Sequence, residues 1–121
     1  MASVAAVAAA LAPILLLTTW PFRSFVSHSH WAAVEWIPFT QKQVPLDFLL
    51  NTLLFVPLGL ALAWRTNLTT IGRITLVGLL VSLMVETFQV FTHSAFSTTA
   101  DVLANTLGAW GGALMWRQRA E

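Results

Sequence analysis

A stripe of polar side chains interrupts one of the apolar stretches of this sequence. Its members follow one another at intervals of four, three and four residues, the spacing that stacks side chains on one face of a helix: Ser82, Glu86, Gln89 and His93. A carboxylate in such surroundings can bind a cation or an amine, exchange a proton, or act as a general acid or base. The structural alternative is a protonated Glu86 that holds neighbouring helices together through hydrogen bonds.

A second set of polar side chains comes from a repeated segment. The pattern Asp-x-Leu-x-Asn-Thr-Leu occurs at residues 47–53 and again at residues 101–107. It places Asp47 one helical turn from Asn51, and Asp101 one turn from Asn105. Helix capping by Asp explains a single copy, whereas two copies with Asn at the same position favour a shared role. An unbonded Asn is costly among apolar residues, so both Asn side chains are expected to face the protein interior.

We expect these side chains to converge on one outward-facing polar pocket. Its ligand-binding residues would be Glu86, Gln89, Asp101, Asn105, Asp47 and Asn51. Carboxylates and amides without a basic residue suit a cation, an amine or sugar hydroxyls better than a phosphate. We assign no catalytic residue, metal ligand or cofactor, because the sequence has no cysteine, nucleophile elbow, metal-binding motif or phosphate-binding glycine loop.

The composition indicates which class of protein must position these residues. The chain has 121 residues, of which 57% are hydrophobic and 9% are charged, with a formal net charge of +1 and no cysteine. So few charges do not solvate an ordinary globular surface, which indicates an integral membrane protein. Soluble enzymes, basic nucleic-acid-binding proteins and disulfide-rich secreted domains are excluded. The length allows a single domain, residues 1–121.

The charged positions divide the chain into four apolar segments. They predict membrane-spanning helices at about residues 4–22, 47–64, 74–92 and 100–116, with an outer loop at about residues 23–46. A cleaved signal peptide is the alternative for the first segment. We prefer a retained helix, because no Lys or Arg precedes the apolar residues and Pro13 interrupts them.

The predicted fold is an all-α integral membrane protein, a four-transmembrane-helix bundle. Helices two and four carry the repeat and run in the same direction, so the chain is expected to form two parallel hairpins. Arginines gather on one side of the bundle, which places that side and both termini in the cytoplasm: Arg65, Arg73, Arg117 and Arg119. Small residues at four-residue spacing permit close packing with helix three of the same chain, or with a second copy in an oligomer: Ala104, Gly108 and Gly112.

Several short motifs, taken in order, match a known family. They are Trp36-Ile37-Pro38-Phe39, Asp47 followed by Asn-Thr-Leu-Leu-Phe-Val-Pro-Leu-Gly at residues 51–59, Glu86-Thr87-Phe88-Gln89, and residues 101–108 with Gly112. In this combination the chain resembles the VanZ-like membrane proteins from about residue 35 onward. The resemblance implies a bacterial cytoplasmic-membrane protein with a cell-envelope role and an association with low-level teicoplanin resistance, but no defined reaction. The family usually has an arginine six residues before the last Asp, where this chain has Ala95.

Three functional hypotheses follow from these patterns. The leading one is a non-enzymatic protein that binds a polar lipid headgroup, a lipid-linked precursor or a glycopeptide-like ligand; its partners are membrane lipids and not nucleic acid. The second is a small proton-coupled multidrug exporter in which Glu86 exchanges a proton for a cationic drug. The third is an intramembrane hydrolase with Glu86 and Asp101 as acid and base, which requires the two carboxyl groups to lie close enough to couple.

Overall fold

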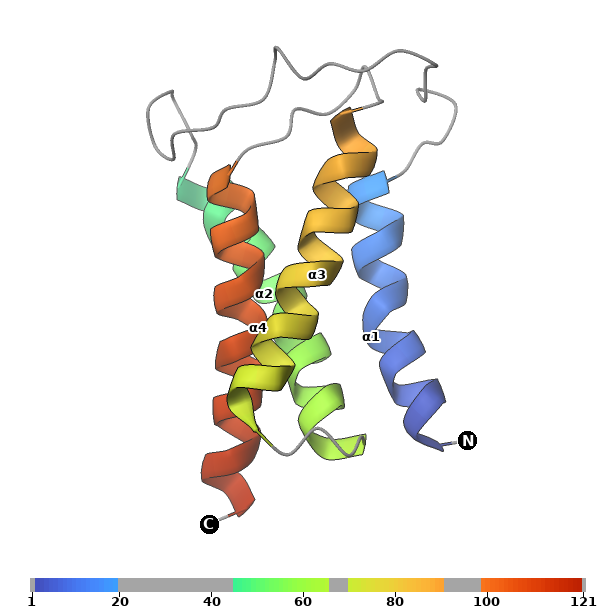
Figure 1. Cartoon of the computed structure of the whole chain (residues 1–121), viewed down its shortest axis with the longest axis vertical. Helices are drawn as coiled ribbons and strands as arrows, with labels where there is room; N and C mark the ends of the chain where they lie inside the picture. The colour runs from blue at the N-terminus through green and yellow to red at the C-terminus, as the bar shows by residue number, and fades with distance from the viewer. Residues whose placement is uncertain (1, 20–44, 66–69, 91–98, 121) are drawn as a thin grey trace.

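The protein folds as a bundle of helices. The computed structural model describes residues 2–19, 45–65, 70–90 and 99–120, and within these ranges the only regular elements are α1 (Ala2–Thr19), α2 (Pro45–Arg65), α3 (Ile71–Val90) and α4 (Thr99–Ala120). Four predicted helices and the all-α class are therefore confirmed. Helices α1 and α3 run in one direction and α2 and α4 in the other, so α1 begins at the same end of the bundle at which α4 finishes (Figure 1).

Helices α3 and α4 extend furthest past the boundaries that the charged residues suggested. Helix α3 begins at Ile71 because Thr70 caps it: the Arg73 amide donates to Thr70 Oγ1 at 3.4 Å, and the Ile74 amide donates to the Thr70 carbonyl at 3.2 Å. Helix α4 continues to Ala120 and carries Arg117 and Arg119 in its last turn. Cations are favoured there, because the carboxyl end of a helix has a partial negative charge. The positions of charged residues therefore did not mark the ends of these two helices.

The closest contact in the bundle joins α2 and α4 at three glycines. A Cβ atom at Gly108 would meet the Thr52 carbonyl oxygen, and one at Gly112 would meet that of Val56. In the reverse direction, a Cβ at Gly59 would meet the Ala109 carbonyl oxygen. All three distances fall well below 3.0 Å, the limit for real Cβ atoms, so the two backbones touch without side chains between them.

This contact answers one question that the sequence left open. Gly108 and Gly112 were expected to pack against helix three or against a second copy of the chain. That expectation was wrong for both glycines, because they contact α2 of the same chain. The third member of the stripe, Ala104, is fully buried. The association of copies into an oligomer stays a prediction.

The interior of the bundle is built mainly from small residues, and its surface from large apolar ones. Buried positions include Ala10, Ala61, Ala100, Ala104, Ala109 and Ala113, with Ile14, Phe55 and Leu58 as the main large side chains. Large apolar side chains are exposed on every helix, for example Leu17, Leu50, Leu53, Met84, Leu107 and Met115. Among the described residues, α2 and α3 contain stretches long and apolar enough to cross a membrane, Leu46–Trp64 and Ile71–Gln89, and α1 contains a shorter apolar stretch, Val4–Leu17.

We predict that Gly108→Ala destabilises the bundle by about 1–3 kcal/mol, the usual range for overpacking a tight interior. The new methyl group would collide with the backbone of Thr52, which has no flexible end that could move aside. The measurement is thermal unfolding in a mild detergent, followed by circular dichroism.

Gly111→Ala is the matched control, because nothing lies within 4 Å of a Cβ at that position. Ala is the better helix former by about 1 kcal/mol, so this variant should unfold at or above the temperature of the unmodified protein. Equal unfolding temperatures for the two variants would contradict the backbone contact.

Candidate functional site

The two copies of the repeated segment are joined to each other by a hydrogen bond. Asn51 on α2 donates from Nδ2 to Oδ1 of Asp101 on α4 at 2.9 Å. Both side chains are half-buried. The Asn of the first copy therefore binds the Asp of the second, and the bond is strengthened by the charge of the acceptor when Asp101 is ionised.

A second polar contact links α4 to α3. Asn105 donates from Nδ2 to Ser82 Oγ at 2.9 Å. Ser82 is fully buried and Asn105 is 1% exposed. Burial of Asn105 was predicted, and it is confirmed. Ser82 belonged to the predicted polar stripe but not to the predicted site, and its spacing from Glu86 was the signal that could have included it.

The same Asn105 side chain has an acceptor atom that no described residue satisfies. Its Oδ1 is buried and accepts no hydrogen bond from the described part of the chain. A buried acceptor without a donor costs about 1–3 kcal/mol, and such atoms are uncommon in folded proteins. An N–H or O–H group brought to this atom would recover that free energy.

The Ser82–Asn105 bond also fixes where the carboxyl groups of Glu86 and Asp101 lie along the axis of the bundle, relative to each other. Helices α3 and α4 run antiparallel (Figure 1). Glu86 follows Ser82 by one turn on α3, and Asp101 precedes Asn105 by one turn on α4, so both carboxyl groups lie about 6 Å further toward the same end of the bundle. Glu86 is buried, with 8% of its surface exposed. Gln89, close to one further turn along α3, is half-buried.

The remaining predicted residues are placed differently. Asp47 lies in the first turn of α2 and is exposed. The capping interpretation suits this position, because a carboxylate is favoured at the start of a helix. His93, Ala95 and the predicted outer loop at residues 23–46, except for its last two residues, lie outside the described residues.

The described cluster is rich in acceptors and polar amides. It comprises two carboxyl groups at one level, the amides of Asn51 and Asn105, and the Ser82 hydroxyl. Among the described residues, no group of three or more His, Cys, Asp or Glu side chains is placed to hold a metal ion. The arrangement can therefore accept hydrogen bonds from an ammonium or hydroxyl group better than it can hold an anion.

We predict that the Asn51–Asp101 bond contributes about 1 kcal/mol of coupling free energy. The measurement is a double-mutant cycle with Asn51→Ala and Asp101→Ala, each unfolded by denaturant in detergent. A control cycle pairs Asn51→Ala with Asp47→Ala, which lies one turn away on the same helix, and should give about 0.3 kcal/mol or less. Equal coupling in both cycles would show that the interhelical bond does not stabilise the bundle.

Comparison with known families supports the resemblance seen in the motifs. A family model described as VanZ/LLP1 matches residues 4–119. Comparison with curated proteins and with solved structures gave no match. The matched range contains nearly the whole chain, with α2 and α3 and the bonded residues Asn51, Ser82, Asp101 and Asn105 inside it. The chain therefore belongs to the VanZ/LLP1 family.

Proposed function

We propose that this protein crosses the bacterial cytoplasmic membrane four times, with both termini in the cytoplasm. Family membership and the two long apolar helices indicate a membrane protein. The exposed Leu and Met side chains on all four helices add support, because a surface of this kind suits lipid better than water. The apolar stretch of α1 is shorter than those of α2 and α3, and α4 is less apolar than either. We propose that α1 and α4 cross the membrane by packing against α2 and α3.

The proposed orientation depends on the distribution of charge between the two ends. Arg73, Arg117 and Arg119 lie at the end where α1 begins, whereas Asp47 and Asp101 lie at the other. Membrane proteins keep an excess of Lys and Arg on the cytoplasmic side. The polar cluster, which lies toward the acidic end, then faces the outer leaflet.

We predict that a cysteine at position 46 reacts with a membrane-impermeant maleimide in intact spheroplasts, while one at position 118 reacts only after permeabilisation. The chain has no natural cysteine, so Leu46→Cys and Gln118→Cys each carry a single reactive group. Both positions are exposed in the structure and outside the polar cluster. Labelling of Gln118→Cys in intact spheroplasts would reverse the proposed orientation.

For the activity itself, we propose a non-enzymatic cell-envelope role. In this proposal the polar cluster binds a donor group, an ammonium or a hydroxyl, of a lipid headgroup, a lipid-linked precursor or a glycopeptide-like ligand in the outer leaflet. The observation that carries the proposal is the buried Oδ1 of Asn105, one turn below the level of Glu86 and Asp101, to which no described residue donates a hydrogen bond. Low-level glycopeptide resistance, which the family resemblance implies, would be one consequence of such binding.

We predict that native mass spectrometry of the protein, extracted from bacterial membranes in mild detergent, shows a co-purified ligand that Glu86→Gln and Asn105→Ala lose. The first variant removes a charge or a proton at nearly constant volume, and the second removes the orphaned acceptor. Thr87→Ala is the matched control. Thr87 is the neighbour of Glu86 and is exposed, and its hydroxyl donates to the Leu83 carbonyl of its own helix.

Unfolding temperatures of the same samples separate loss of ligand from loss of fold. Retention of the ligand in both folded variants would assign the cluster a purely structural role. No ligand in any sample would favour the second candidate, a proton-coupled multidrug exporter. Burial of Glu86 within Ile71–Gln89, a stretch apolar enough to cross a membrane, favours that candidate. The exporter candidate requires that a pH gradient drives efflux of a cationic drug and that Glu86→Gln abolishes this efflux.

A further inference from the structure

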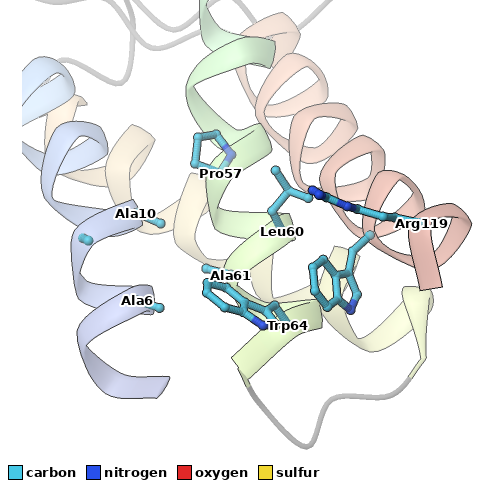
Figure 2. A pocket seen from close by; sticks show the side chains of 9 residues that line it. Ala6, Ala10, Pro57, Leu60, Ala61, Trp64 and Arg119 are labelled. Carbon is cyan, nitrogen blue, oxygen red and sulfur yellow. The ribbon is translucent and has the colours of Figure 1, made fainter. Parts of the chain in front are cut away.

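A groove of about 780 Å³ lies between α1 and α4, with α2 as its floor. Its lining residues are Ala6, Ala9 and Ala10 from α1, Pro57, Leu60, Ala61 and Trp64 from α2, and Trp116 and Arg119 from α4 (Figure 2). It lies at the end of the bundle where α1 begins and where α2 and α4 finish. The polar cluster lies toward the opposite end, so the groove is a separate feature.

The groove stays open because most of the residues that line it are small. Ala6, Ala10 and Ala61 present only methyl groups, and Pro57 adds a compact ring. Helix α1 packs on α2 and α3 but leaves this side of α2 uncovered between itself and α4. The volume falls within the range of about 300–1,000 Å³ that is usual for small-molecule sites.

Two tryptophans mark the depth of the groove in the proposed membrane. The rings of Trp64 and Trp116 lie with their centroids 5.8 Å apart and their planes tilted by 39°. Tryptophan is enriched where hydrocarbon meets the headgroups. Ala9 and Ala10 of α1 and Pro57 of α2, which are further from the helix ends, would then line the part of the groove that lies in the hydrocarbon region.

The groove carries one positive charge at one end of an apolar lining. Arg119 is the charged residue among its described lining residues, and no carboxylate accompanies it there. Its side chain extends from α4 toward Leu60 of α2, across the groove (Figure 2). An apolar channel with one guanidinium at its headgroup end complements an amphiphile with an aliphatic tail and an anionic head, and guanidinium binds phosphate through paired hydrogen bonds.

We propose that this groove binds one acyl chain of an anionic phospholipid of the cytoplasmic leaflet, whose phosphate pairs with Arg119. The leaflet follows from the orientation proposed above, whereas the binding of the lipid does not depend on it. The ligand differs from that of the polar cluster in both its charge and the end of the bundle at which it binds.

The experiment is titration of the purified protein in detergent with phosphatidylglycerol, or with phosphatidylcholine of the same acyl chains, followed by native mass spectrometry. We expect one phosphatidylglycerol to bind preferentially and Arg119→Gln to weaken its binding about tenfold, the effect of losing one charge-assisted contact. Arg117→Gln removes the same charge from a residue outside the groove lining and should leave binding unchanged.

A second pair of variants tests the apolar part. Ala9→Trp places a large ring in the groove and should abolish binding of the lipid, whereas Ala8→Trp, at an exposed neighbouring position outside the lining, should not. Glu86→Gln should retain phosphatidylglycerol, so failure of the polar-cluster proposal and failure of this one give different results.

Three results would overturn the proposal. The first is unchanged phosphatidylglycerol binding in both Arg119→Gln and Ala9→Trp. The second is equal binding of glycerol phosphate, which would show an anion site without an acyl chain. The third is a dimer lost in Ala9→Trp without any lipid, which would assign the groove to a second copy of this chain. Labelling of Gln118→Cys in intact spheroplasts would overturn the assignment to the cytoplasmic leaflet alone.

Discussion

Direct contact between the backbones of α2 and α4 is the constraint on which the other features depend. Helices with ordinary side chains between them lie about 8–10 Å apart, and glycines at both sides of this contact remove the intervening atoms. The contact aligns the two copies of the repeat side by side in the same direction. Only then can the short side chain of Asn51 reach Asp101.

The polar interior follows from this alignment, because in the proposed membrane the bundle must satisfy its polar groups internally. Asn51 and Asp101 satisfy each other across α2 and α4, and Asn105 reaches Ser82 on α3. The exception is Oδ1 of Asn105. Among the buried side-chain N and O atoms of the described residues, this acceptor is the one without a hydrogen-bond partner. Exceptions of this kind concentrate at functional sites.

The sequence predicted the four helices and the burial of Asn105, because each depends on one segment alone: the first on apolar length between charges, the second on the cost of an unbonded Asn among apolar residues. It did not predict which helix Gly108 would meet, or that Asn51 would bind Asp101, because those depend on how whole helices are rotated against each other. Asp47 and Asp101 occupy equivalent positions in the repeat, yet within the described part of the chain an amide lies opposite Asp101 and not opposite Asp47. The groove was also missed, because its alanines are indistinguishable in sequence from ordinary helix formers.

The direction of α2 and α4 connects this packing to the chemistry of the two ends. Both helices start at the end that carries Asp47 and Asp101, and α4 finishes with Arg117 and Arg119. The partial positive charge of a helix start favours the carboxylates, and the partial negative charge of its finish favours the arginines. The dipoles of α1 and α3 point the opposite way and offset those of α2 and α4, so the charged side chains are what make the two ends of the bundle electrostatically opposite. In the proposals made above, the same polarity orients the bundle in the membrane through its arginines, favours a donor ligand at one end, and favours an anionic headgroup at the other.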